Sequence, residues 1–198
     1  MPAVIAEGIR RSPLADYAGR FAASHGGVLI REPPFVAQFD LRAEPGDTDV
    51  MRRVATALGF AVPFGPNTVA SLDEHRALWL GPDEWLVVGP ESQHQVLEQA
   101  LRDGLAGAFG SIVDVSAHRT LLEIRGEEAR DLLAHGIAID LDPRSFPAGS
   151  CAQTLLAKAQ VIIERRESSF VLYVRTSFAG YVVDWLLDAA DLEITSSR

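Results

Sequence analysis

The chain has 198 residues, one cysteine and a net charge of −9, with 27 acidic against 18 basic side chains. Nucleic-acid binders usually carry a basic stripe, a lone cysteine excludes an internal disulfide, and no apolar run approaches the ~18 residues of a membrane span. The N-terminus lacks the pattern of a secretory signal, so composition predicts a soluble, cytoplasmic protein that binds neither nucleic acid nor membrane.

The first 34 residues differ in character from the rest of the chain. Apolar residues at helical spacing predict a short helix within residues 14–23. Paired glycines at 26–27 and paired prolines at 33–34 then interrupt the chain. We interpret residues 1–34 as an N-terminal arm outside the core, and residues 35–198 as one domain.

A first run of elements follows the arm. Asp47 or Thr48 is suited to cap its first helix and Gly59 to end it. Ser92 and Gln95 have the spacing of a capping box for its second helix. In chain order we expect a strand at 35–41, a helix at 48–58, a Pro-containing loop, strands at 68–71, 77–80 and 85–88, and a helix from 92 to 103.

The same order of elements occurs a second time. It comprises a strand at 120–124, a helix at 126–135, a Pro-containing loop, strands at 151–157, 161–164 and 170–174, and a helix that Ser177 would cap. Trp85 in the first run corresponds to Phe170 in the second, an offset of 85. The sequence therefore predicts an α+β fold of mostly antiparallel sheet, built from two similar halves at about 35–110 and 111–190.

The predicted strands are apolar on both faces. ALWL and WLVV in the first half, and TLLA, VII and FVLYV in the second, are near-continuous apolar runs. Such runs are typical of sheets that are buried on both sides. The predicted helices can cover one side of each sheet. The other side is covered either by the other half or by a partner chain, and the sequence alone leaves both open.

Two groups of residues have side-chain types used in nucleophilic catalysis. Cys151 has no histidine near it in sequence, and a small buried residue is its simpler interpretation. Asp114, Ser116 and His118 include the three side-chain types of a hydrolase triad. Triad members, however, meet through the fold rather than by adjacency. We therefore predict no catalytic residue in either group.

Other motifs also have simpler structural interpretations. The histidines never occur as a pair three or four residues apart, which argues against zinc; they are His25, His75, His94, His118 and His135. Spaced glycines at 104, 107 and 110 lack the strand-to-helix context of a dinucleotide fingerprint. Asp83 and Glu84 are interpreted as a solvated turn tip. The sequence thus predicts no catalytic, cofactor-binding or metal-binding residue.

Three longer stretches resemble a known family. They are LGPDEWL (80–86), DLDPRSFPAGSCAQTLLAK (140–158) and VRTSFAGY (174–181). With the sequence around them, they closely resemble the gamma subunit of bacterial heterotetrameric sarcosine oxidase, over about residues 28–190. That family is similar in fold to the folate-binding domain of the glycine cleavage aminomethyltransferase.

The resemblance implies a role within a larger enzyme. Such an enzyme has alpha, beta, gamma and delta subunits and oxidises sarcosine to glycine and hydrogen peroxide. It gives methylenetetrahydrofolate when tetrahydrofolate is present. FAD, FMN, NAD and zinc belong to the other subunits, and no catalytic position of the family transfers to this chain. The resemblance implies a non-catalytic subunit with alpha as its direct contact.

Two other classes remain open from the sequence. One is a free-standing folate-binding or aminomethyltransferase-like protein, for which 198 residues are short. The other is an iron–sulfur assembly factor of the same fold, to whose cysteine motif GSCAQT is a poor match. For the gamma-subunit interpretation we expect alpha to cover apolar surface, and the arm to serve assembly more than the fold.

Overall fold

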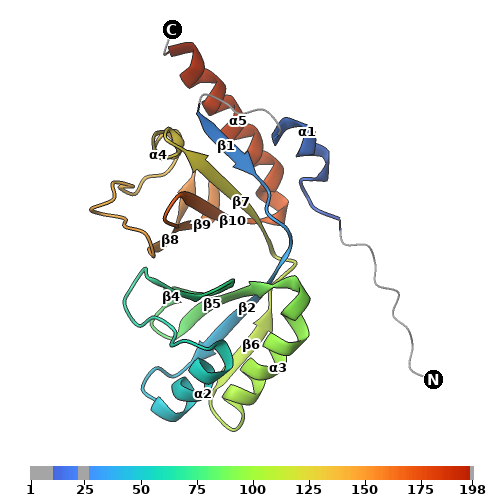
Figure 1. Cartoon of the computed structure of the whole chain (residues 1–198), viewed down its shortest axis with the longest axis vertical. Coiled ribbons are helices and arrows are strands. Elements are labelled where there is room, and N and C mark those ends of the chain that lie inside the picture. Colours follow the sequence, from blue (N-terminus) through green and yellow to red (C-terminus); the bar gives the residue numbers. More distant parts are fainter. Residues whose placement is uncertain (1–10, 22–26, 197–198) are drawn as a thin grey trace, which may run out of the picture.

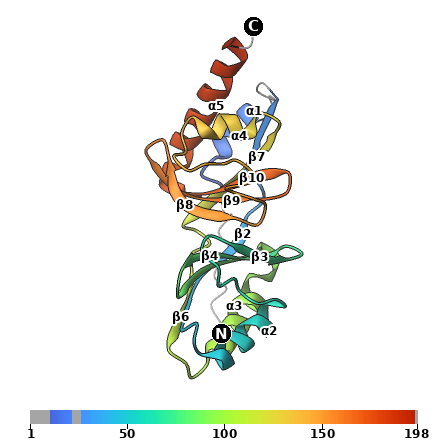
Figure 2. The same cartoon turned by 90° about the vertical axis from the view of Figure 1, so that its left-hand side faces the viewer.

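The computed structural model describes residues 11–21 and 27–196, which form four layers in the order helices, sheet, sheet, helices (Figures 1 and 2). The two sheets face each other, and each carries its helices on its outer face. Among the described residues, no helix is both long enough and apolar enough to span a bilayer.

The first sheet has five strands, all antiparallel to their neighbours. In spatial order they are β3 (Val69–Leu72), β4 (His75–Gly81), β5 (Glu84–Pro90), β2 (Val36–Ala43) and β6 (Gly110–Asp114). Helices α2 (Thr48–Leu58) and α3 (His94–Leu105) pack on its outer face and bury one apolar cluster with it. Trp85 lies in this cluster, fully buried, and its indole Nε1 donates to the Pro63 carbonyl at 2.7 Å.

The second sheet also has five antiparallel strands. In spatial order they are β8 (Cys151–Leu156), β9 (Ala159–Arg165), β10 (Ser169–Arg175), β7 (Arg119–Gly126) and β1 (Val28–Arg31). Helices α4 (Ala129–Ala134) and α5 (Ala179–Ser196) cover its outer face. The short α1 (Ala18–Phe21) packs beside α5, where the Tyr17 hydroxyl donates to Asp184 at 3.1 Å.

The two halves have the same strand order, as the sequence predicts. From each inner strand outward, β2-β5-β4-β3 corresponds to β7-β10-β9-β8. The predicted offset also holds, because β5 starts at Glu84 and β10 at Ser169, 85 residues later. The α+β prediction with two similar halves is confirmed.

The fifth strand of each sheet is exchanged between the halves. β1 precedes β2 in the chain but pairs with β7 in the second sheet. β6 precedes β7 but pairs with β2 in the first sheet. The chain therefore crosses between the sheets twice, at 32–35 and at 115–118, and the two crossings lie side by side (Figure 1). Neither exchanged strand was predicted from the sequence.

We interpreted residues 1–34 as an arm outside the core. This interpretation was wrong for much of the part of that segment that the structure describes. Leu14, Val28 and Ile30 are at most 2% exposed and belong to the apolar cluster of the second sheet. The sequence misled because VLIR is a strand of only four residues, flanked by the glycine and proline pairs that we interpreted as breaks. Its pairing partner, β7, lies about 90 residues away in sequence.

The inner faces of the two sheets cover each other. Leu78, Leu86 and Val88 from the first sheet pack against Ile162 and Val171 from the second. This cluster answers the question raised by the apolar strands, because the other half shields the second face of the β4–β5 hairpin. The expectation that alpha is needed to cover that face was wrong.

Helix ends follow the predictions only in part. Asp47 caps α2, accepting from the Val50 amide at 3.1 Å, and Gly59 ends it with a left-handed φ of 81°. The capping box at Ser92 was wrong, because residues 91–93 form a 3₁₀ turn before α3. Ser177 also lies in such a turn, before α5, rather than at a helix cap. In both cases an extra turn inserts between strand and helix.

Gly136 is a position where one methyl group should be costly. A Cβ there would lie 2.5 Å from the indole of Trp185 and 2.8 Å from Leu156 Cδ1. We expect Gly136→Ala to lower the free energy of unfolding by about 1–3 kcal/mol, the usual cost of overpacking. Urea unfolding would measure it. Gly19→Ala is the control, because open space surrounds that helical position; equal stability of both variants would contradict the prediction.

Candidate functional site

Polar groups in this fold gather between the two sheets and at the chain crossings. Among the residues that the structure describes, six polar or charged ones are buried: Gln38, Ser116, Thr120, Glu123, Glu164 and Ser169. Glu123 on β7 and Glu164 on β9 both stand opposite Val171 in the strand register, on the face that meets the first sheet. The inter-sheet layer is therefore apolar at its centre and carries two buried carboxylates.

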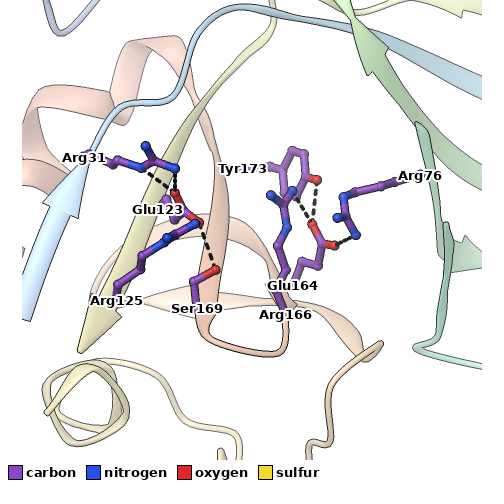
Figure 3. A network of polar contacts seen from close by, with 8 residues as sticks. All are labelled: Arg31, Arg76, Glu123, Arg125, Glu164, Arg166, Ser169 and Tyr173. Carbon is purple, nitrogen blue, oxygen red and sulfur yellow. Dashed lines mark hydrogen bonds and ion pairs between the residues drawn. The ribbon is translucent and has the colours of Figure 1, made fainter. Parts of the chain in front are cut away.

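Glu164 links the two sheets. Arg76, from β4 of the first sheet, donates to its Oε1 at 2.8 Å. Arg166 and the Tyr173 hydroxyl donate to its Oε2 at 3.0 and 2.9 Å (Figure 3). Burial and the adjacent carboxylate charge raise the pKa of Tyr173 well above its usual value. The phenol therefore stays protonated and acts as a fixed donor.

Glu123 is held in a similar way within the second sheet. Arg31 from β1 and Arg125 donate to its two oxygens at 2.5 and 2.9 Å, and the Ser169 hydroxyl donates at 3.0 Å (Figure 3). Burial alone would raise the pKa of Glu123, but the hydrogen bonds from these donors outweigh it and lower the pKa. An ionised carboxylate saturated with donors is suited to fixing strands in register rather than to proton transfer.

Two of the three triad-like residues meet, because the Ser116 backbone amide donates to Asp114 Oδ1 at 2.9 Å, but the imidazole beside Asp114 is not that of His118. Asp114 binds His94, with its Oδ2 2.9 Å from Nε2, rather than His118. The Ser116 hydroxyl accepts from the Gln38 amide at 2.9 Å at the crossing between β6 and β7. The structure thus places the serine and aspartate in backbone and surface contacts. Neither contact joins the serine to a histidine base.

Cys151 is a buried structural residue. Its side chain is fully buried, and its thiol lies 3.4 Å from the Trp79 carbonyl and 3.5 Å from that of Thr68. Burial, with the nearby Glu164 charge, raises the pKa of the thiol to about 12. A thiol that stays protonated at neutral pH is a poor nucleophile.

The prediction of a solvated turn at residues 83–84 is correct for Asp83 and wrong for Glu84. Asp83 is exposed, at 58% of its side-chain surface, but Glu84 is 23% exposed and pairs with Arg42. Burial, together with the negative charge of Asp40, raises the pKa of Glu84. The interpretation of both acids as a solvated tip was therefore wrong for Glu84, which begins β5 and lies beside β2.

The spaced glycines and the other histidines singled out from the sequence have structural roles or positions. Gly104 lets α3 approach the backbone of α2, Gly107 adopts a φ of 78°, and Gly110 starts β6. His75 starts β4 and His135 follows α4, while His25 lies outside the described residues. Within residues 11–21 and 27–196, no three His, Cys, Asp or Glu side chains are gathered as for a metal ion.

One cavity of about 430 Å³ opens at the second sheet. Arg119 and Arg175, directly opposite each other on β7 and β10, line it together with residues of β8 and β9. Burial and the adjacent Arg175 lower the pKa of Arg119, and the charges of Asp40 and Glu84 offset this only in part. No sequence motif marks this pair, because its two members are 56 positions apart.

Comparisons with known proteins agree on one family. Residues 42–192 match the model of the "Sarcosine oxidase, gamma subunit family". A sarcosine oxidase subunit gamma from Arthrobacter sp. is 37% identical over 185 residues, covering 91% of this chain and 90% of that protein. The corresponding subunit from Corynebacterium sp. (strain P-1) is 36% identical with the same coverage.

Solved structures give the same result. A chain of the heterotetrameric sarcosine oxidase from Corynebacterium sp. U-96 matches with a TM-score of 0.85 and 34% identity, over 92% of this chain and 95% of that one. Aminomethyltransferase T from Bartonella henselae matches with a TM-score of 0.69 at 13% identity, over 91% of this chain and 57% of that one, which shows a shared fold. The chain belongs to the sarcosine oxidase gamma subunit family.

Proposed function

We propose that this chain is the gamma subunit of a heterotetrameric sarcosine oxidase and that its role in the complex is structural. The match to a chain of a solved heterotetrameric sarcosine oxidase, over 92% of this chain and 95% of that one, carries the proposal. The three other subunits, alpha, beta and delta, are its partners, and alpha contacts it directly. The complex works in the cytoplasm.

The reaction belongs to the complex as a whole. It oxidises sarcosine to glycine and hydrogen peroxide, and it forms methylenetetrahydrofolate when tetrahydrofolate is present. FAD, FMN, NAD and zinc are held by the other subunits. The gamma subunit supplies no catalytic group to this reaction.

The chemistry of the buried groups supports a structural role. The two inter-sheet carboxylates are bound by arginines, and the only cysteine has a strongly raised pKa. At the chain crossing, the Asp114 carboxylate accepts from the Ser116 backbone amide and contacts His94 Nε2. These groups hold strands in place, and none of them is poised to attack a substrate or to exchange a proton with it.

Apolar side chains at the edges of the structure support contact with another chain. Phe109 is 93% exposed, just before the edge strand β6, and Val113 within that strand is 51% exposed. Edge strands with exposed apolar residues favour association. The Asp83 carboxylate, which borders the same region as Phe109, would lie at the polar rim of such a contact.

Coexpression with the three other subunits tests the proposal. A tag on this chain should bring down alpha, beta and delta in equal amounts, with flavin absorbance and sarcosine-dependent peroxide production. A tag on an unrelated chain is the control. A chain that ignores all three subunits and instead binds folate by itself would favour the free-standing aminomethyltransferase-like alternative.

The isolated chain should be colourless and inactive. None of its described groups forms a metal cluster or an activated nucleophile. The measurement is the visible spectrum of the purified chain, with peroxide production from sarcosine. Stoichiometric flavin absorbance, or turnover without the other subunits, would contradict a structural role.

A further inference from the structure

The cavity at the second sheet has a cationic wall. Arg119 is half-buried, Arg175 is exposed, and the two are direct neighbours across the antiparallel pair β7–β10. Directly opposite like charges destabilise a strand pair.

Neither guanidinium is neutralised by a direct contact. In the described part of the chain, most buried or half-buried arginines bind a carboxylate, as Arg76 and Arg166 bind Glu164. Arg119 and Arg175 make no ion pair and no side-chain hydrogen bond with the described residues. The positive charges also reach His118, whose pKa is lowered by burial, Arg119 and Arg175. The wall therefore has unused donors that suit an anion.

The rest of the lining is mixed. Leu155, Ile162 and Tyr173 contribute apolar surface, and Gln153 and Gln160 contribute amides. Gln153 Nε2 already donates to the Leu80 carbonyl at 2.9 Å, which fixes the side chain and ties the cavity edge to the first sheet. A volume of about 430 Å³ lies within the range of small-molecule sites, roughly 300–1,000 Å³.

We propose that this cavity binds a small organic acid, whose carboxylate is held by Arg119 and Arg175 and whose apolar part lies against Leu155 and Ile162. Planar guanidinium groups match a carboxylate in charge and geometry. An inorganic anion would use the arginines but leave the apolar wall without contacts. This inference does not rest on the proposed function, because it concerns a site within this chain alone.

Benzoate and benzamide form a matched pair of probes for this site. They share size and ring, and only benzoate carries the charge. We expect benzoate to bind the full chain in calorimetric titration and benzamide to bind at least about tenfold more weakly, since hydrogen bonds from a guanidinium to a carboxylate are stronger than those to a neutral amide. Inorganic phosphate, a third probe, should also bind more weakly than benzoate.

Arg119→Met and Arg175→Met test the two donors while keeping the aliphatic stem. Each should weaken benzoate binding about tenfold or more, whereas Arg144→Met, at a side chain that is 91% exposed and is not part of the cavity lining, should leave it unchanged. Without ligand, Arg119→Met should be at least as stable as the parent chain in urea. A purely structural arginine would show the opposite, a loss of stability.

Several results would overturn the proposal. The first is that benzoate fails to bind at about 10 mM, a concentration that detects even millimolar affinity. The second is that benzoate and benzamide bind equally well. The third is that both arginine variants bind benzoate as tightly as the parent chain. Binding to the isolated chain that disappears in the assembled complex would assign the cavity to a carboxylate of a partner subunit instead. Copurification with the other subunits, which tests the proposed function, is scored separately and does not depend on either arginine.

Discussion

A chain that begins at residue 32 should fail to form the native fold. The truncation removes β1 and three buried apolar side chains, Leu14, Val28 and Ile30. Each such side chain contributes about 1.5–3 kcal/mol through burial. Their sum rivals the roughly 5–15 kcal/mol of net stability of a typical domain. The truncation also exposes the edge of β7 and leaves Glu123 without Arg31.

Circular dichroism and gel filtration would measure the effect. We expect loss of the cooperative melt together with aggregation, because a long apolar strand edge invites pairing between chains. A chain that begins at residue 11 is the matched control, since it keeps every described contact. This expectation replaces the sequence-based one, in which removal of residues 1–30 weakens assembly more than the fold. A folded, monomeric product that begins at residue 32 would restore the earlier view.

Replacement of Glu164 by leucine should be the most damaging single substitution. It leaves Arg76 and Arg166 without a carboxylate in the layer between the sheets, where their side chains are 22% and 29% exposed. It also removes the acceptor of the Tyr173 hydroxyl. Breaking one side of a buried ion pair costs about 3–5 kcal/mol, because the remaining charge stays buried without a partner. Urea unfolding at neutral pH would give the difference in free energy.

A double-mutant cycle separates the pair from the packing. Glu164→Leu combined with Arg76→Met should lose less than the sum of the two single variants, by at least about 1 kcal/mol. The control is Arg102→Met, which breaks a surface pair with Glu98 on α3 and should cost at most about 0.5 kcal/mol. Strict additivity of the two inter-sheet substitutions would show that Arg76 does not stabilise the contact between the sheets.

Local patterns in the sequence were sufficient for most elements. Apolar runs, glycines and prolines predicted α2 and β8 to within a residue or two, and the offset of 85 aligned β5 with β10. These signals are local, because a strand or helix shows its periodicity within its own residues. The repeated order also allowed the correct fold class.

Non-local pairing was the part that could not be predicted. β1 and β6 are short, and no residue pattern in VLIR or GSIVD indicates that each strand pairs with the sheet of the other half. The buried carboxylates were missed for the same reason, since Arg76 and Glu164 are 88 residues apart. Burial of Glu84 depends on the neighbouring strand β2, which a turn motif does not reveal.

The candidate site, like the fold, could be predicted from the sequence only in part. Sequence reasoning assigned Cys151 to the buried interior, and the structure agrees. The arginine pair at the cavity carried no signal, because a strand that starts with Arg119 and one that ends with Arg175 become neighbours only when β7 and β10 align. Two like charges in one register position could be recognised only after the register itself was known.

The exchange of β1 and β6 sets the order in which a growing chain can complete its sheets. All five strands of the first sheet have been synthesised once residue 114 has left the ribosome. β1 is made before any of them, yet its partner positions on β7 run from Glu123 to Gly126, 92 to 98 residues later. The earliest strand can therefore pair only late, when β7 becomes available as its neighbour at the edge of the second sheet. A break in the gene between residues 114 and 119 would leave the first product with a complete first sheet and an unpaired β1, and the second product with a sheet that lacks its β1 edge strand.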